Sequence, residues 1–300
     1  MADTPQSKSA FIAIVGRPNV GKSSLLNALV AGKVAIVSDK PQTTRNRIIG
    51  VLTEGETQLV FIDTPGLHKP RTRLGEFMVG QVRESITDVD VAVLVTDTMG
   101  FIARDEQALM DQLAASGIPA ILVINKIDLL ENKRDLLSLI SKFSDAFSFD
   151  AVFPISVLQN DGVSALLPEL KKYAAEAPHF FPDDALTDQP ERVMASEILR
   201  EKMLRNLFDE LPHGVAIGIE RFSEREGGGM LDIHAVIYCE RAGHKGMIIG
   251  KGGAMLKKIA SEARAEMEAF FGVKINLQCW VKVKDDWRND ERALRSLGYQ

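Results

Sequence analysis

Cysteine is scarce in this chain: Cys239 and Cys279 are too few among 300 residues to form a framework of disulfide bonds. Both lie in apolar stretches, which predicts reduced side chains in a core. Long apolar runs are also missing, since none approaches the roughly 20 residues of a membrane-spanning helix. The first ten residues, MADTPQSKSA, lack the apolar run of a signal peptide. We therefore expect a cytoplasmic protein with a flexible tail at residues 1–9. We also expect a monomer, for which the sequence offers no direct argument.

The overall charge is acidic, with a formal net charge of −5, which at first sight argues against a nucleic-acid partner. Local charge decides whether a phosphate backbone is attracted, however. Residues 241–260 contain no acidic side chain and five basic ones, namely Arg241, Lys245, Lys251, Lys257 and Lys258. The length suggests two domains, and the 45% of apolar residues is typical of soluble globular proteins.

The first half of the chain alternates buried strands with amphipathic helices. Strands are predicted at residues 11–16, 58–63, 89–97, 120–126 and 151–156, and helices at 23–30 and 104–116. This alternation predicts an α/β domain at residues 10–177, with a mostly parallel sheet covered on both faces. A ligand is then expected at the carboxyl ends of the strands.

The second half has a different pattern. Three prolines interrupt residues 176–191, which predicts a linker at 178–191. Beyond it, a helical run precedes two strand-like segments joined by the turn REGGG, then two helical segments flanking a glycine-rich turn, and a last strand. This order predicts an α+β domain at residues 192–300.

One motif predicts a phosphate loop, because it follows a strand, precedes a helix and matches GxxxxGK[ST]. It comprises Gly16, Arg17, Pro18, Asn19, Val20, Gly21, Lys22 and Ser23, with Ser24 beside it. Its backbone N–H groups and the helix N-terminus form an anion nest. Lys22 is expected to reach the β- and γ-phosphates and Ser23 to bind Mg²⁺. The alternative is an incidental glycine-containing turn.

A second motif ends the next apolar strand and suits a magnesium site. It consists of Asp63, Thr64, Pro65 and Gly66, followed by Leu67. Asp63 is expected to hold the ion, and the N–H of Gly66 to sense the γ-phosphate. Alone the motif is weak, because Asp and Gly are common in turns.

The third motif, Asn125-Lys126-Ile127-Asp128, selects guanine. The Asp128 carboxylate accepts hydrogen bonds from the N1–H and 2-amino groups, which adenine does not offer. Asn125 is expected to tie this loop to the phosphate loop, and the Lys126 stem to cover the base. The three motifs in this order predict a guanine-nucleotide site.

Two weaker elements complete that site. Thr43 and Thr44 lie in a polar stretch between strands, and one of them is expected to reach Mg²⁺; we slightly prefer Thr43. Ser156 and Val157 follow a strand and are expected to offer backbone N–H groups to the guanine carbonyl.

The glycine-rich turn of the second half predicts an RNA site. A GXXG loop clamps about four nucleotides in KH modules. The residues concerned are Lys245, Ile249, Gly250, Lys251, Gly252, Gly253 and Lys257. The alternative is a helix connection without a ligand. Neutralisation of phosphate here predicts RNA binding that weakens as salt rises.

These motifs together resemble the bacterial Era family over nearly the whole chain. The resemblance rests on GRPNVGKS, QTTR, DTPGLH, NKID, GHKGMIIGKGG and VKVKDDWR. It implies a TrmE-Era-like P-loop GTPase domain followed by a type-II KH domain that binds small-subunit (16S-type) ribosomal RNA near its 3′ end. A role in assembly and maturation of that subunit, and peripheral contact with the cytoplasmic face of the inner membrane, are implied as well.

Two positions, Leu67 and Val157, depart from patterns common in related GTPases, and a third, Asn19, matches one. Leu67 stands where many GTPases place a glutamine that orients the attacking water, and its side chain cannot do this. Asn19 matches a position linked in related GTPases to a bound K⁺ ion, so K⁺ is expected besides Mg²⁺. Val157 replaces the alanine usual in relatives.

We therefore predict a GTPase that hydrolyses GTP to GDP and phosphate. The competing hypothesis is an RNA-binding scaffold in which a guanine nucleotide is only structural. A tRNA-modifying relative is disfavoured, because the second half shows no catalytic equipment.

Overall fold

The computed structural model describes residues 7–67, 70–209 and 211–299, and the chain divides into two compact units. Unit 1 comprises the described residues of 1–35, 44–69 and 78–188, and unit 2 those of 36–43, 70–77 and 189–300. The change of unit after Asp188 falls inside the predicted linker. The sequence did not predict that two short segments of the first half would belong to unit 2.

Unit 1 is built on a sheet with strand order β2-β3-β1-β4-β5-β6, and β7 pairs with the amino-terminal end of β1. Its strands are β1 (Lys8–Gly16), β2 (Ile48–Glu54), β3 (Thr57–Asp63), β4 (Val91–Thr96), β5 (Ala120–Ile124), β6 (Ala151–Pro154) and β7 (Ala175–Glu176). All pairings are parallel except those of β2 and β7. The mostly parallel α/β sheet predicted from the apolar runs is therefore confirmed.

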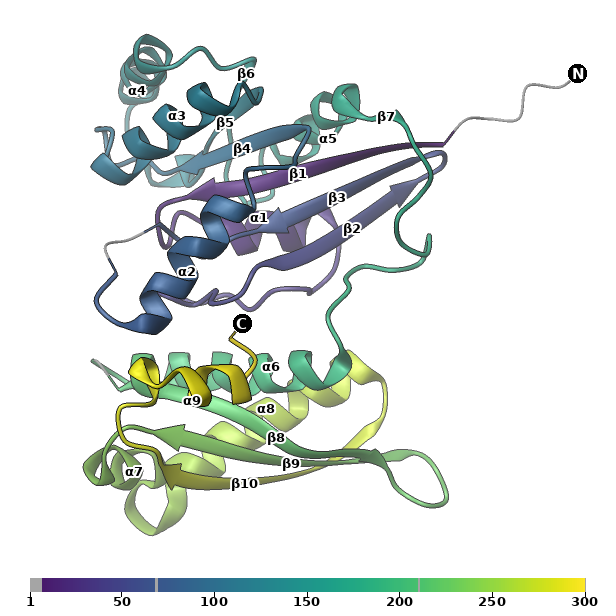
Figure 1. The fold of residues 1–300 in the computed structure, drawn as a ribbon, viewed down its shortest axis with the longest axis vertical. Coiled ribbons are helices and arrows are strands. Elements are labelled where there is room, and N and C mark those ends of the chain that lie inside the picture. The colour runs from purple at the N-terminus through teal and green to yellow at the C-terminus, as the bar shows by residue number, and fades with distance from the viewer. Residues whose placement is uncertain (1–6, 68–69, 210, 300) are drawn as a thin grey trace, which may run out of the picture. The chain divides into compact units, whose positions relative to one another are not determined.

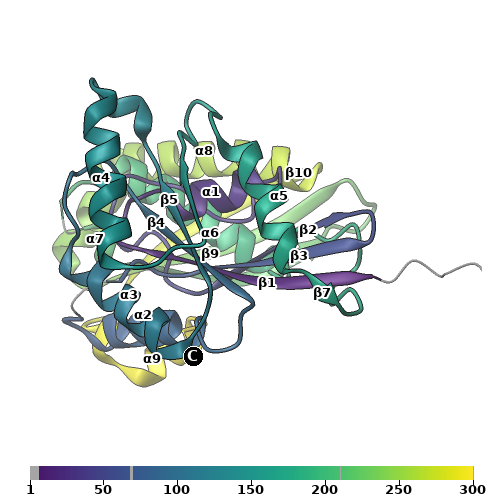
Figure 2. The ribbon, with the colours of Figure 1, turned by 90° about the horizontal axis from the view of Figure 1, so that it is seen from above.

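Helices cover both faces of this sheet, as Figure 2 shows for α1 and α5 on one side and α2 and α3 on the other. Their bounds are α1 (Lys22–Leu29), α2 (Arg73–Glu84), α3 (Arg104–Ser116), α4 (Lys133–Ala146) and α5 (Leu166–Leu170). Alternate residues of β1 supply the two cores: Ile12 and Ile14 face α1 and α5, whereas Ala13 and Val15 face α2, α3 and α4. This two-sided burial explains the continuous apolar runs.

The ends of unit 1 differ from the predicted boundaries. Strand β1 begins at Lys8, so residues 8 and 9 of the predicted tail lie in the sheet, and residues 1–6 lie outside the described part. The predicted linker runs along the sheet edge: the Val51 N–H donates to the Leu186 carbonyl at 2.9 Å, and Gln58 bonds the backbone of Phe181. The linker is thus docked on unit 1 up to residue 188.

Unit 2 has a three-stranded sheet of order β10-β9-β8, with α6 and α8 packed on one face (Figure 1). Its elements are α6 (Glu191–Asn206), β8 (Val215–Glu224), β9 (Met230–Cys239), α7 (Ala242–Ile249), α8 (Ala254–Phe271), β10 (Lys274–Val283) and α9 (Glu291–Ser296). Strand β10 runs parallel to β9, and β8 runs antiparallel to it. The predicted α+β domain is confirmed.

Within unit 2, helix α6 holds the main chain of the segment 36–43. The buried Glu201 carboxylate accepts a hydrogen bond from the Val37 N–H at 3.0 Å, and the buried Arg200 guanidinium donates to the carbonyl of Thr43. The second segment, 70–77, is held by Arg73, which pairs with Glu291 of α9. In the part of the chain that the structure describes, no helix combines the length and apolarity needed to cross a membrane.

Candidate guanine-nucleotide and RNA sites

The phosphate loop joins the carboxyl end of β1 to α1, as the sequence predicted. Lys22, the first residue of α1, is only 6% exposed, and its Nζ donates to the carbonyls of Gly16 at 3.1 Å and Arg17 at 2.9 Å. Burial lowers the pKa of Lys22 to about 8; nearby Asp63 opposes this shift and Arg17 adds to it. The ammonium group thus lies inside the anion nest, where it can move from carbonyls to phosphate.

Three oxygen-bearing side chains meet beside Lys22. The Ser23 hydroxyl donates to Asp63 Oδ2 at 2.6 Å and lies 2.8 Å from Thr44 Oγ1. Asp63 is fully buried, and its Oδ1 has no hydrogen-bond partner among the described residues. Burial raises the pKa of Asp63 to about 6 despite the opposing Lys22. A buried carboxylate with an unused oxygen, flanked by two hydroxyls, fits a hard divalent cation.

The structure brings Thr44, not Thr43, to this cluster. The Thr43 hydroxyl instead donates to the Lys40 carbonyl at 2.6 Å, away from Ser23. This geometry does not support our slight preference for Thr43, and it makes Thr44 the better candidate for the magnesium ligand. The sequence contained no signal to choose, because the two threonines are adjacent and the contact of Thr44 with Ser23 joins residues that are far apart in the sequence.

The motif after β3 lies directly against the phosphate loop. A Cβ atom on Gly66 would come within 2.6 Å of the Pro18 backbone, so only glycine fits this approach. The Leu67 N–H contacts the Gly16 carbonyl at 3.4 Å, while its side chain packs on the core between the sheet and α3. The Thr64 hydroxyl donates to the Ile14 carbonyl at 2.9 Å. Leu67 thus offers no polar group to a water.

Asn125 links the guanine motif to its neighbours, as predicted. Its Nδ2 donates to the Val20 carbonyl at 2.8 Å, and its Oδ1 accepts from the Val157 N–H at 3.1 Å. The Lys126 ammonium donates to the Asn19 carbonyl at 2.6 Å. The guanine motif and the phosphate loop are therefore joined by two side chains.

The carboxylate predicted to select guanine is held by a serine. The Ser156 hydroxyl donates to Asp128 Oδ1. The Ser156 N–H donates to the Asp161 carbonyl at 3.0 Å, and the Val157 N–H is used by Asn125. In this structure both N–H groups donate within the protein, and their approach to the guanine carbonyl stays a prediction. The Ser156 hydroxyl holds Asp128, and the Val157 N–H holds Asn125.

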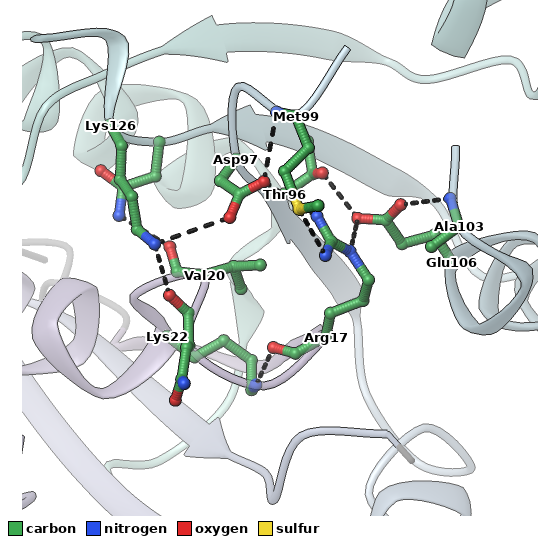
Figure 3. Close-up of polar contacts among 11 residues, drawn as sticks. Arg17, Val20, Lys22, Thr96, Asp97, Met99, Ala103, Glu106 and Lys126 are labelled. Carbon is green, nitrogen blue, oxygen red and sulfur yellow. Dashed lines mark hydrogen bonds and ion pairs between the residues drawn. The ribbon is translucent and has the colours of Figure 1, made fainter. Parts of the chain in front are cut away.

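An ionic network outside the phosphate loop was not predicted (Figure 3). The Arg17 side chain turns away from the nest: its Nη2 donates to Asp97 and its Nε to Glu106, each at 2.8 Å. Although burial opposes the charged form, these two acids outweigh it and raise the pKa of Arg17. Asp97 follows β4, so the rule that ligands bind at strand ends pointed to it; Glu106 inside a helical pattern carried no such signal.

The GXXG loop connects α7 to α8 in unit 2. Gly250 has φ of 72°, and a Cβ atom there would lie 2.7 Å from that of Met255, so the turn requires glycine. Lys245, Lys251 and Lys257 are all exposed. Gly252 and Gly253 complete the turn after Ile249, the last residue of α7. The loop thus presents backbone and positive charge to solvent.

The fold and these sites define a P-loop GTPase coupled to a KH module of the second type. Family models agree: "50S ribosome-binding GTPase" matches residues 11–126, and "KH domain" matches residues 210–288. GTPase Era of Ruminiclostridium cellulolyticum is 50% identical over 98% of both chains. GTPase Era of Clostridioides difficile is 48% identical over 97% of this chain and 98% of its own.

Solved structures give the same result. A substituted Aquifex aeolicus Era bound to GDP·AlF₄⁻ aligns with a TM-score of 0.93 at 37% identity, covering 97% of this chain and 99% of its own. An Era structure with MgGDPNP and nucleotides 1506–1542 of 16S ribosomal RNA also has a TM-score of 0.93, at 36% identity, covering 98% and 99%. The chain belongs to the GTPase Era family and is a GTPase.

Proposed function

We propose that this GTPase is a magnesium-dependent switch that binds small-subunit ribosomal RNA near its 3′ end and acts in assembly and maturation of that subunit. The observation that carries the RNA half is the exposed, acid-free GXXG region around Lys251. The full-length similarity to an Era solved with a 16S RNA fragment supports it. A cytoplasmic location, a monomeric state and peripheral membrane contact stay predictions.

The nucleotide half rests on the buried cluster beside the phosphate loop. We assign Ser23, Thr44 and Asp63 to Mg²⁺, because the unpartnered Asp63 Oδ1 needs a cation to offset its burial. A magnesium ion held there would offset the negative charge of the β- and γ-phosphates. Lys22 moves from the loop carbonyls to the phosphates, and the Gly66 N–H senses whether the γ-phosphate is present. Asp128, oriented by Ser156, selects guanine.

We take the segments around 38–47 and 63–75 as the switches that GTP orders, and each has residues in both units. Thr44 reaches the nucleotide site in unit 1, while the preceding residue, Thr43, is bonded through its carbonyl to Arg200 of α6 in unit 2. His68 and Lys69 of the second segment lie outside the described residues. A change in Thr44 on loss of the γ-phosphate must therefore pass along the chain to a segment that α6 holds. This supports nucleotide-controlled RNA binding.

Hydrolysis needs a substitute for the missing glutamine, since Leu67 is apolar and core-packed. We propose K⁺ near Asn19, whose backbone is held in a left-handed conformation with φ of 63° in the phosphate loop. The rate of phosphate release is expected to be higher in K⁺ than in Na⁺, and Asn19→Asp is expected to lose that difference. Equal rates in both salts, or an unchanged Asn19→Asp variant, contradict a role for K⁺.

The RNA assignment is tested by crosslinking followed by sequencing of the bound RNA. We expect reads to accumulate near the 3′ end of small-subunit RNA and to decline with Lys251→Gln. Lys274→Gln is a matched control, because it removes a lysine of the same unit that pairs with Glu268. Reads spread evenly over unrelated RNA would remove the ribosomal assignment and leave the GTPase intact.

A further inference from the structure

The Arg17 guanidinium is bound by two acids from different elements of unit 1. Asp97, directly after β4, accepts from Nη2, and Glu106, in the first turn of α3, accepts from Nε, both at 2.8 Å (Figure 3). Guanidinium groups suit such paired contacts because their donors form a rigid fork. The phosphate loop is thereby fastened from outside, on the side away from the nest.

Glu106 is a fixed anchor for this contact. Its side chain is fully buried, and Oε1 also accepts from the Thr96 hydroxyl at 2.6 Å. Its Oε2 accepts from the Ala103 N–H at 2.8 Å, which caps helix α3. A buried carboxylate with several donors cannot reorient without leaving them unpaired. The position of Arg17 is therefore set by β4 and α3.

Asp97 has a second cation on its other oxygen. The Lys126 ammonium lies 3.5 Å from Asp97 Oδ2 and donates to the carbonyl of Asn19. One carboxylate, 13% exposed, therefore connects the first turn of the phosphate loop, through Arg17, with the guanine motif, through Lys126. The loop is held at positions 17 and 19, on both sides of Pro18.

We propose that Arg17, Asp97 and Glu106 are positioning residues, a clamp that fixes the phosphate loop against the guanine motif and so sets the affinity for GDP and GTP. The proposal rests on the nucleotide site assigned above. A loop already held in its binding shape loses less conformational freedom when nucleotide binds. None of the three side chains needs to touch the nucleotide.

The clamp predicts an effect opposite in sign to simple electrostatics. A nucleotide is an anion, so removal of the negative charge of Asp97 would by itself tighten nucleotide binding. If the clamp is lost with that charge, nucleotide binding weakens instead. We expect Asp97→Asn to weaken GDP binding about tenfold, the size of one charged hydrogen bond. Arg17→Gln is expected to weaken GDP binding as much. The double variant, Arg17→Gln with Asp97→Asn, is expected to bind GDP no more weakly than the single variant with the lower affinity.

The experiment is fluorescence titration of the full chain with a labelled GDP, well below the melting temperature of each variant. Asp111→Asn is the control, since it removes an exposed acid outside the clamp, on the helix α3 that carries Glu106. Lys22→Met tests the site itself: if it binds normally, the nucleotide site is misassigned, whatever the clamp does. A folded Asp97→Asn protein with unchanged or tighter binding overturns the clamp, as do effects that simply multiply in the double variant.

Folding failure of Asp97→Asn would leave Arg17→Lys to decide. A lysine keeps the charge but cannot bond Asp97 and Glu106 with the same fork, so a several-fold loss of affinity is expected. Wild-type affinity in Arg17→Lys overturns the proposal.

Discussion

The two glycine-rich loops of this protein, one predicted to bind nucleotide phosphates and the other RNA, differ in how the rest of the chain holds them. The phosphate loop of unit 1 is enclosed. Its own Arg17 donates to Asp97, Asn125 and Lys126 donate to its carbonyls, and Lys22 is buried inside it. The GXXG loop of unit 2 is open, and Lys251 has no side-chain partner among the residues that the structure describes. One loop is shaped before its ligand arrives, whereas the other offers mainly charge.

The difference follows from what each ligand demands. A single small nucleotide is recognised by a fixed set of donors, so loss of one well-placed group is costly. A long polyanion is attracted by many weak charges, so loss of one is tolerated and depends on salt. Substitutions in the phosphate loop and the guanine motif of unit 1 are therefore expected to have larger and more specific effects than those in the GXXG loop of unit 2.

The largest effect is expected for Asp128→Asn. Two hydrogen bonds to a charged acceptor are worth about 3–6 kcal/mol together, so GDP affinity is expected to fall by about 10²–10⁴-fold. Xanthine nucleotides, which carry an oxygen in place of the 2-amino group, are expected to bind better than GDP. Calorimetry with both nucleotides measures this, with Asp135→Asn, an exposed acid on α4, as control. A variant that still prefers GDP removes Asp128 as the group that selects guanine.

A smaller effect is expected for Lys251→Gln. RNA affinity is expected to fall several-fold, and the slope of log affinity against log salt by about 0.7, the value for one phosphate contact of a single strand. Nucleotide affinity is expected to stay unchanged. Filter binding at several salt concentrations measures both quantities. An unchanged slope means that Lys251 does not contact phosphate, and the open-loop half of the comparison is then wrong.

The smallest effect concerns the docked linker. His179 contacts Asp183 at 2.6 Å and the Glu56 carbonyl at 3.1 Å, and these two acceptors raise its pKa. The folded state thus favours protonated His179. Its contribution to stability is complete below the ordinary pKa of about 6.5 and is lost as pH rises through the raised value.

The melting temperature of unit 1 is expected to fall by only about a degree or two across that window, because the pair is near the surface. His179→Gln is expected to remove this part of the pH dependence. Identical pH profiles for the variant and the wild type would show that the contact does not stabilise the linker.

The sequence predicted which residues carry the chemistry of the site better than it predicted the contacts that hold those residues in place. Strand runs and the three motifs located Lys22, Asp63 and Asp128, because spacing along one strand–turn–helix unit fixes such residues. The choice of Thr44 over Thr43 and the role of Glu106 depend on contacts between elements far apart in sequence. Periodicity does not encode such contacts. The inclusion of residues 36–43 in unit 2 escaped prediction for the same reason, since it depends on Glu201 and Arg200.

The central claim is that hydrolysis of GTP and binding of RNA are coupled in one chain. The most direct test measures phosphate release from GTP by the full protein, in K⁺ and Mg²⁺, with and without the 3′ region of small-subunit RNA. We predict measurable release that changes with RNA, and a smaller change in Lys251→Gln. Release that RNA does not alter contradicts the coupling, and an absence of release with bound GTP supports the RNA scaffold with a structural nucleotide.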